Sequence, residues 1–223
     1  MAKHLQRDLD QLSKDVLSLG GRVEEAINKA ITSLLERRID LAQQVIQGDA
    51  VIDAREVEIE EECLKLLALH QPVAADLRFV VAVLKVNNDL ERMGDHAATI
   101  ASRSKYLSTH MPIQASGGVR EMAEGVRRMV SACLDSLVNH DTAKAREVCR
   151  LDDEIDDANR RLFVEIQHAM MKDPDSVKRC VRILSVTKQL ERIGDLATNI
   201  AQDVIFMVEG ELVRHTAPDD PEA

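Results

Sequence analysis

Hydrophobic residues recur at intervals of three and four along almost the whole chain, which is the spacing of amphipathic α-helices. The first such stripe consists of Leu5, Leu9, Leu12, Val16, Leu19, Val23, Ala26 and Ala30. The pair Gly20-Gly21 lies within this stripe and predicts a bend, because glycine weakens the interior of a helix. The pattern as a whole predicts an all-α protein.

Five further helices are expected from the same spacing and from the residues that interrupt it. The second runs from about Asp49 to His70 and is stopped by Gln71-Pro72, since the residue before a proline disfavours the helix. The third begins near Asp76, which is a suitable N-cap. The stretch at residues 108–118 then breaks the pattern with STHMPIQASGG and predicts a linker.

The second half of the chain repeats this programme. A fourth helix begins around Val119, and the stripe of a fifth contains Ile155. Asp173-Pro174-Asp175-Ser176 reads as a stop followed by the cap of a sixth helix, whose stripe contains Ile183. The tail APDDPEA is rich in proline and acidic residues and predicts disorder.

The two halves are an internal duplication of a three-helix unit. The segment LERMGDHAATIA at residues 90–101 returns as LERIGDLATNIA at residues 190–201. Helix three therefore maps onto helix six with an offset of 100, and helix two maps onto helix five with an offset of 103. Short loops favour antiparallel neighbours, so two antiparallel three-helix bundles are expected. We place them at residues 1–109 and 117–210, followed by a disordered tail at residues 211–223.

Composition supports this fold and removes several classes of function. Hydrophobic residues make up 45% of the 223 residues, but aromatic residues only 2%, which is typical of helical proteins rather than β-sandwiches. The net charge of −10 argues against a nucleic-acid-binding protein. There is no apolar run long enough to insert into a membrane and no export signal, so a cytoplasmic protein is expected. Reduced, buried thiols are expected for Cys63, Cys133, Cys149 and Cys180.

Pairs of acidic residues four positions apart are the main candidates for chemistry, because residues i and i+4 share a helix face. There are four such pairs, two in each half: Asp49/Asp53, Glu91/Asp95, Asp152/Asp156 and Glu191/Asp195. If helices two and three lie side by side, their four carboxylates converge, and helices five and six repeat the arrangement. A cation bound through oxygen would relieve the repulsion. Iron or manganese suits such a multinuclear site better than zinc, and magnesium or calcium is also compatible.

Simpler interpretations of these acids stay open at this point. Acidic residues on a helix exterior are most often a solvated face. Asp49 and Asp152 could cap or complement helix N-termini, and Arg92 and Arg192 could pair with Asp95 and Asp195. The alternative functions are a carboxylate-bridged metal enzyme or a metal-storage protein. Di-iron enzymes need two Glu-x-x-His motifs, however, and Glu165-Ile-Gln-His168 is a single one. No catalytic grouping is apparent, so we expect a protein that is not an enzyme.

At these residues the chain resembles the PhoU family of bacterial phosphate-transport accessory and signalling proteins. The similar stretches include GGRVEEAINKAI, DLAQQVIQGDAVID, LALHQPVAADLRFVVAVLKVNNDLERMGDHAATIA and LERIGDLATNIAQDVIFMVEG. The resemblance covers about residues 4–210 and implies two three-helix bundles. It also implies that the eight acids occupy the family's Glu/Asp-x-x-x-Asp motifs, which hold surface metal clusters in some members.

The same resemblance implies a function and partners. Family members restrain phosphate uptake and silence the phosphate-starvation response. They link the phosphate ABC transporter, through its ATPase, to a membrane sensor kinase. The resemblance thus implies a cytoplasmic adaptor that its partners hold at the inner membrane, and a homodimer.

Overall fold

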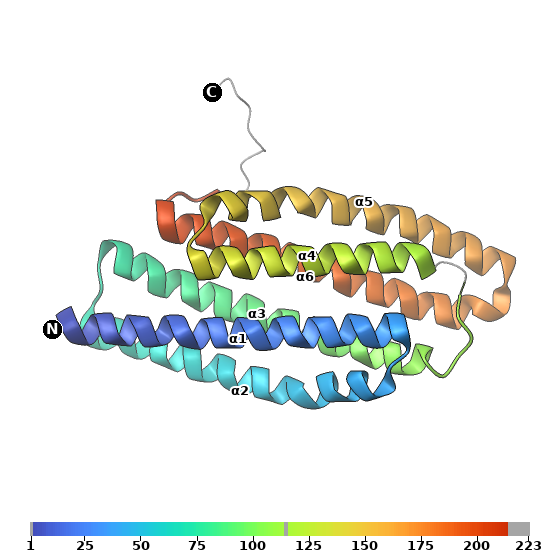
Figure 1. The fold of residues 1–223 in the computed structure, drawn as a ribbon, viewed down its shortest axis with the longest axis horizontal. Coiled ribbons are helices and arrows are strands. Elements are labelled where there is room, and N and C mark those ends of the chain that lie inside the picture. The colour runs from blue at the N-terminus through green and yellow to red at the C-terminus, as the bar shows by residue number, and fades with distance from the viewer. Residues whose placement is uncertain (1, 114–115, 214–223) are drawn as a thin grey trace, which may run out of the picture.

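The protein is described by a computed structural model that covers residues 2–113 and 116–213. Within these residues the chain forms six α-helices, one short 3₁₀ turn and no strand, so the all-α prediction is confirmed (Figure 1). The elements are α1 (Ala2–Glu36), α2 (Ile39–His70), α3 (Ala74–Leu107), α4 (Ser116–Asn139), α5 (Thr142–Lys172), η1 (Pro174–Ser176) and α6 (Val177–Glu209). No helix of the described part is long and apolar enough to cross a membrane.

Each half is a bundle of three helices joined by tight connections, as the duplication predicts. α1, α2 and α3 pack on one another, and so do α4, α5 and α6. Local details recur at the predicted offset of 103. The residue that follows the first helix of each half, Arg37 after α1 and His140 after α4, has a left-handed backbone, with φ of 59° and 53°. Just before these turns the hydroxyls of Ser33 and Ser136 donate to the carbonyl three residues earlier, at 2.7 Å in both halves. The two halves therefore have the same backbone conformation at their first helix connection.

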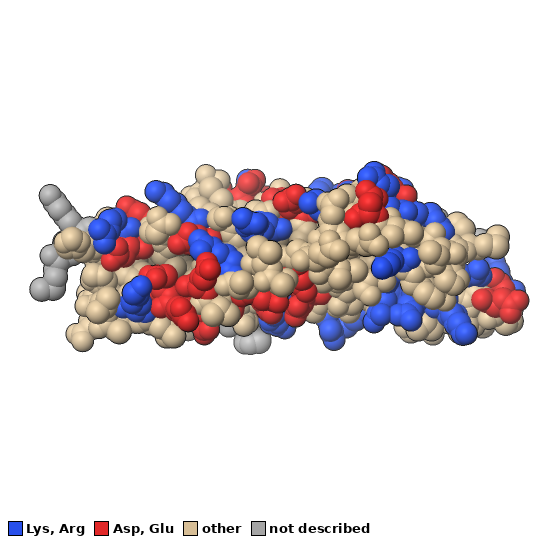
Figure 2. Space-filling view, turned by 90° about the horizontal axis from the view of Figure 1, so that it is seen from below, with Lys and Arg blue, Asp and Glu red and all other residues tan. Residues whose placement is uncertain are grey.

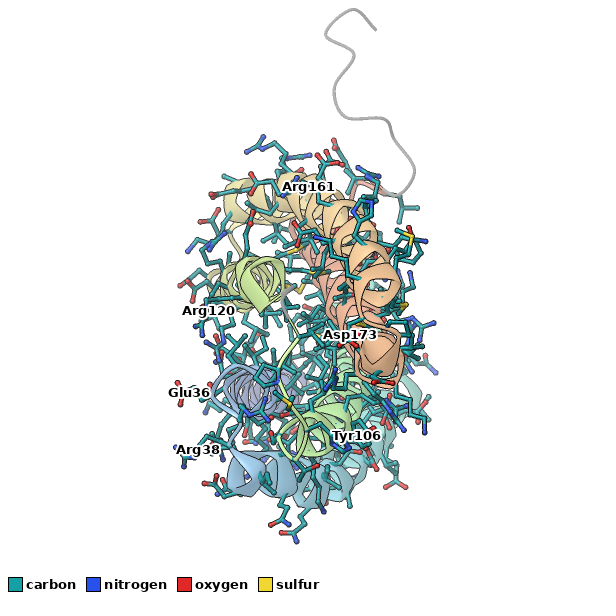
Figure 3. All side chains as sticks on the ribbon, turned by 90° about the vertical axis from the view of Figure 1, so that its right-hand side faces the viewer. Glu36, Arg38, Tyr106, Arg120, Arg161 and Asp173 are labelled. Carbon is teal, nitrogen blue, oxygen red and sulfur yellow. The ribbon has the colours of Figure 1, made fainter. Side chains whose placement is uncertain are left out.

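The halves are joined along α3 and α6, which run antiparallel. Lys85 Nζ lies 3.2 Å from Asp203 Oδ1, and Arg103 Nε lies 3.4 Å from the Ser185 hydroxyl at the other end of the contact. α1 and α4 also contact each other, so the first half lies below the second in the end view of Figure 3. A single hydrophobic cluster extends through both halves. The two bundles thus form one body with a shared core.

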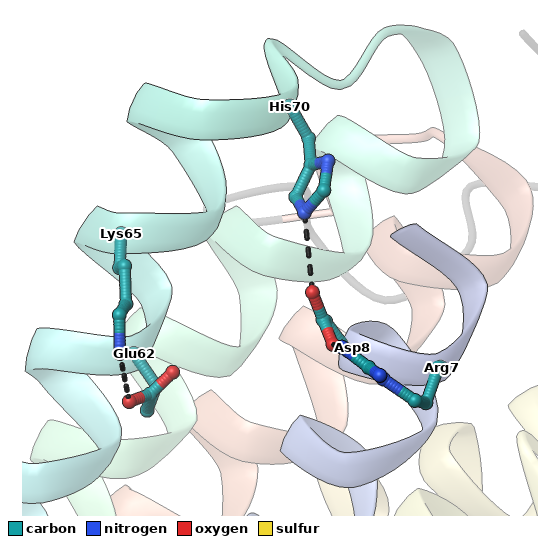
Figure 4. A network of polar contacts seen from close by, with 5 residues as sticks. All are labelled: Arg7, Asp8, Glu62, Lys65 and His70. Carbon is teal, nitrogen blue, oxygen red and sulfur yellow. Dashed lines mark hydrogen bonds and ion pairs between the residues drawn. The ribbon is translucent and has the colours of Figure 1, made fainter. Parts of the chain in front are cut away.

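Polar contacts tie the outer helices to this frame. At the end of α2, His70 Nε2 lies 3.2 Å from Asp8 Oδ2 of α1 (Figure 4). Arg7 and His70 together lower the pKa of Asp8. On the same stretch of α2, Lys65 pairs with Glu62 at 2.8 Å. The Lys65–Glu62 pair is exposed and adds little stability, whereas the partly buried Asp8–His70 contact fixes which end of α2 faces the start of α1.

Several expected helix boundaries were wrong. α2 begins at Ile39 and α5 at Thr142, about ten residues before the stripes that mark them in the sequence. Asp141 is the N-cap of α5 and accepts a hydrogen bond from Lys144 N at 3.0 Å. Asp49 and Asp152 therefore lie inside helices and cap nothing. The buried residues Ala42 and Val45 of α2, and Ala145 and Val148 of α5, show that the apolar face of each helix continues before the acids.

Smaller corrections concern caps and glycines. α3 begins at Ala74, two residues before the expected cap Asp76. Before α6, Asp173 caps the 3₁₀ turn η1 by accepting a hydrogen bond from Asp175 N at 3.1 Å, while Ser176 occupies the N-cap position of α6 without a side-chain capping hydrogen bond. α1 runs without interruption through Gly20-Gly21, where the missing side chain of Gly20 leaves room for Leu134. α4 includes Gly117 and Gly118, which shortens the expected linker.

Of the predicted tail, residues 214–223 lie outside the described residues. The cysteines behave as expected within the described part: all four are free, three are buried and Cys149 is half-buried. Burial raises the pKa of Cys63 to about 12.

Two glycines near the middle of the first bundle predict opposite responses to substitution. A Cβ at Gly94 would lie 3.2 Å from both Cγ2 and Cδ1 of Ile52, whereas a Cβ at Gly48 would meet nothing within 4 Å. We expect Gly94→Leu to force α2 away from α3 and to lower the free energy of unfolding by about 1–3 kcal/mol. Gly48→Ala should raise the free energy of unfolding by about 0.5–1 kcal/mol, because alanine loses less backbone entropy on folding than glycine and its Cβ meets no clash. Urea unfolding of both variants measures this, and equal effects would contradict the packing described.

Candidate functional site

The acidic pairs of the first half lie on neighbouring helices, with a hydrophobic contact between them. Asp49 and Asp53 are on α2, Glu91 and Asp95 are on α3, and Ile52 is buried between the two helices. The position of a Gly94 Cβ would be 3.8 Å from Asp49 Oδ1. Because Gly94 has no side chain, α2 approaches α3 closely enough for the acids of the two helices to meet. The predicted convergence of α2 and α3 acids therefore occurs.

Three of these four carboxylates come within ligand distance of one another. Asp49, Asp53 and Asp95 can each present an oxygen such that all three atoms lie within 4.8 Å of each other. Asp49 is half-buried, whereas Asp53 and Asp95 are exposed. Burial, followed by the charges of Asp53 and Asp95, raises the pKa of Asp49. The group combines close negative charges with partial desolvation, which is costly unless a proton or cation compensates.

Glu91 lies beside this trio and interacts with it electrostatically. It is half-buried, and burial, then Asp95 and Asp53, raises its pKa. It does not belong to the group of three at ligand distance. The sequence correctly places Glu91 on the face that α3 shares with these acids. The register between the helices, however, keeps Glu91 outside the group of three carboxylates at ligand distance.

Glu56 is a neighbouring carboxylate that the sequence reasoning missed. It is half-buried on α2, and burial, then the charges of Glu60 and Asp53, raises its pKa. Asn87 Nδ2 donates to Glu56 Oε1 at 3.3 Å and to its carbonyl oxygen at 2.9 Å. The sequence signal that could have identified Glu56 is its position three residues after Asp53, which places it one turn further along the same helix face. The first acidic cluster is hereafter Asp49, Asp53, Glu56, Glu91 and Asp95.

The second half repeats the arrangement less closely. The second acidic cluster is Asp152 and Asp156 on α5 with Glu191 and Asp195 on α6. Asp152 Oδ1 lies 3.5 Å from the position of a Gly194 Cβ, as expected from the duplication. Burial, then Asp195 and Asp156, raises the pKa of Asp152 to about 6, and burial and Glu191 raise that of Asp195. Among the described residues, however, only the first cluster contains three acids at ligand distance.

The simple alternatives for these acids are partly removed by the geometry. Arg92 does not pair with Asp95; its Nη1 lies 3.3 Å from Asp89 Oδ1 instead. Acidic side chains gather along the face of the molecule that α2 presents, and Lys and Arg crowd towards one end of it (Figure 2). Asp49, Glu91 and Asp152 are half-buried, and this burial raises their pKa values, so these acids are not an evenly exposed charged face. Their ligand atoms are all carboxylate oxygens, which fits a hard cation and does not favour zinc.

Asp152 provides a test of the cost of ionising a half-buried carboxylate within the second acidic cluster. Because its pKa is raised from 3.8 to about 6, the folded state binds a proton more tightly than the unfolded state, and stability falls as pH rises through this window. The difference corresponds to at most about 3 kcal/mol, and partial exposure reduces it to about 1–2 kcal/mol. We expect Asp152→Asn to match the wild type near pH 4 and to exceed its unfolding free energy by that amount above pH 7.

Urea unfolding in the presence of a chelator, repeated across this pH range, measures the difference. Asp157→Asn is the matched control on the same helix, because Arg160 lowers the pKa of Asp157. It should be neutral or destabilising at neutral pH. If Asp152→Asn has the same stability as wild type at all pH values, neither burial nor the neighbouring carboxylates raise the cost of ionising Asp152 in the folded state.

Comparison with known proteins adds a family to this geometry. The chain matches the PhoU domain at residues 16–104 and again at residues 119–204. A phosphate-specific transport system accessory protein PhoU homolog of Aquifex aeolicus is 37% identical, with 95% of this chain and 96% of the relative covered. A homolog of the same name from Pseudomonas putida is also 37% identical, over 96% of this chain and 84% of the relative.

Solved structures agree with the sequence comparison. The crystal structure of PhoU from Pseudomonas aeruginosa superimposes with a TM-score of 0.90 at 35% identity, covering 92% of this chain and 99% of that one. The phosphate transport system regulatory protein PhoU from Streptococcus pneumoniae gives a TM-score of 0.85 at 31% identity, covering 94% and 99%. With both halves matched and nearly the full length shared, the chain belongs to the PhoU family.

Proposed function

We propose that this protein regulates phosphate uptake and the phosphate-starvation response. It acts as a cytoplasmic adaptor between the ATPase of a phosphate ABC transporter and a membrane sensor kinase, and it carries metal at its acidic clusters. The observation that supports the regulatory role most strongly is the match of both halves to the PhoU domain. Relatives that share nearly the whole chain are named as accessory proteins of a phosphate-specific transport system.

A role without catalysis is part of this proposal. The relatives' names describe accessory and regulatory proteins, not enzymes. The first acidic cluster is open to solvent, with three of its five residues half-buried and two exposed. Such a site offers little exclusion of water, which a metal enzyme would need around its reacting centre. A metal store is the second candidate, and it would need no specific protein partner.

Deletion of the gene tests the regulatory role. We expect the deletion strain to take up phosphate and to express alkaline phosphatase in phosphate-rich medium, because the restraint on both is lost. A plasmid copy of the wild-type gene should restore repression, which excludes effects on neighbouring genes. Normal phosphate uptake and normal phosphatase expression in the deletion strain would contradict the proposal.

Metal capacity is tested separately on purified protein. A cation that binds only the folded state stabilises it by about 2.7 kcal/mol at a hundredfold excess over Kd. For a chain of this length we expect a rise of roughly 5–10 °C in melting temperature. The double variant Asp49→Asn/Asp95→Asn should lose part of this rise and part of the metal found by elemental analysis. A wild-type protein that contains no iron or manganese, and whose melting temperature neither metal shifts, would reject metal binding.

We include a homodimer in the proposal, on the basis of the family resemblance. The exposed hydrophobic residues near the α2–α3 loop, Leu69, Val73 and Leu77, are available for such a contact. Light scattering over a range of concentrations measures the mass, and a constant mass of 24.9 kDa would contradict the dimer.

A further inference from the structure

Positive charges collect at one end of this molecule, although the chain as a whole has a net charge of −10. This end contains the α1–α2 connection, the end of α3, the start of α4 and the turn from α5 to α6, and it faces the viewer in Figure 3. It is also the end towards which Lys and Arg crowd in Figure 2. Seven side chains of these segments are hereafter the basic end: Arg37, Arg103, Lys105, Arg120, Lys172, Lys178 and Arg182.

The basic end is not neutralised by the chain's own carboxylates. None of its seven side chains forms an ion pair within the residues that the structure describes. The two other arginines of these segments, Arg38 and Arg179, are the ones that pair with carboxylates, at 2.6 and 3.2 Å. The remaining carboxylates there are Glu36 and Asp175, so positive charge exceeds negative charge. The basic end is therefore free to meet an anionic partner.

Apolar side chains project from the same end. Met111 in the α3–α4 connection is 76% exposed, and Met171 in the last turn of α5 is 71% exposed. Val177 and Val181 are also exposed, and they share a face at the start of α6 because they lie four residues apart. Lysine and arginine beside exposed apolar groups are the combination by which proteins lie on an anionic bilayer, since the cations meet headgroups and the apolar groups enter the acyl boundary.

The turn that carries Met111 is held in place by the basic end itself. Arg37 Nη2 donates a hydrogen bond to the carbonyl oxygen of His110. The His110 ring stacks on Tyr106, with ring centroids 4.0 Å apart, and the guanidinium of Arg182 lies 5.0 Å from the centroid of the Tyr106 ring. Because this turn is already ordered, presenting Met111 to a partner costs little further conformational entropy.

The acidic clusters lie too far from the basic end to oppose an anionic surface there. Asp49 is ten residues from the start of α2, and Asp95 is twelve residues from the end of α3. These separations correspond to about 15–18 Å along a helix, whereas the Debye length at physiological salt is about 8 Å. An anionic surface that meets the molecule end-on is therefore attracted by the basic end and screened from the acids.

We propose that the basic end is a docking surface for the anionic face of a lipid bilayer, which the molecule meets end-on. Lys and Arg side chains bind phosphate headgroups, and Met111 and Met171 enter the boundary between headgroups and acyl chains. The exposed methionines favour a bilayer over an acidic protein segment, because a bilayer accepts cations and apolar groups together at any spacing. This contact requires neither the metal capacity nor the protein partners proposed above.

Flotation with lipid vesicles tests the inference on untagged, full-length protein in the presence of a chelator. We expect binding to vesicles of equal parts phosphatidylcholine and phosphatidylglycerol, and none to phosphatidylcholine alone. Each Lys or Arg at an anionic surface is worth about fivefold in affinity, so Lys105→Gln/Lys178→Gln should weaken binding by about 25-fold. Added salt should weaken the binding of wild-type protein, because it screens the headgroups.

Matched variants separate this site from the effect of net charge. Lys14→Gln/Arg22→Gln removes the same charge from exposed positions of α1 that lie at least about 20 Å from the basic end, and it should leave the affinity unchanged. Met111→Ser should weaken binding by about fivefold, whereas Leu64→Ser, at an exposed position of α2, should not. Circular dichroism melting confirms that each variant is folded.

Each contrary outcome has a distinct meaning. Equal binding to both kinds of vesicle, or equal losses in the Lys105/Lys178 and Lys14/Arg22 variants, would overturn the basic end as the docking surface. Binding of polyglutamate without binding of anionic vesicles would identify an acidic protein partner and overturn the lipid contact. None of these results changes the phenotype expected of the deletion strain, so a failure here is distinguishable from a failure of the regulatory role.

Discussion

The antiparallel packing of α3 against α6 is the contact on which the arrangement of both halves depends. Asp203 is 1% exposed in this contact, and Lys85 reaches across from the other half to it. Because one hydrophobic cluster extends through both halves, neither bundle could keep its inner face covered alone. Because α3 and α6 are antiparallel, the two halves point in opposite directions along the molecule. The middle of α3, which carries Gly94, therefore lies near the middle of α6, which carries Gly194.

Within each half, hydrophobic packing and charge repulsion oppose each other at the same place. Ile52 and Ile155 are both 4% exposed and contact the surfaces around Gly94 and Gly194. Burying an isoleucine side chain is worth about 1.5–3 kcal/mol, whereas one pair of like charges on an exposed helix face costs about 0.2–0.5 kcal/mol. The packing therefore prevails, and the acids one residue or one turn away are brought together despite their repulsion. Burial and, after it, this repulsion raise the pKa values of Asp49 and Asp152.

Duplication kept the backbone and let the charges diverge. The left-handed turn residues Arg37 and His140 and the serine hydroxyl contacts beside them are the same in both halves, because they close the first helical connection. The equivalent positions Asn88 on α3 and Lys188 on α6 are exposed and carry no such backbone requirement. Substitution at these positions changes the electrostatics of one cluster without disturbing the helices that hold it.

The sequence by itself determined the helices, the repeat and the acids that share a face, because a period of 3.6 residues is a local property that side-chain spacing reveals. It placed all eight motif acids correctly on α2, α3, α5 and α6, although the starts of α2 and α5 escaped it, since Asp49 and Asp152 inside these helices resemble N-cap residues. Only the tertiary structure decided that Asp49, Asp53 and Asp95 approach within ligand distance, that Arg92 turns to Asp89, and that Glu56 joins the first cluster. These facts depend on the register between neighbouring helices and on the direction of each side chain, and both are set by packing between segments far apart in the chain.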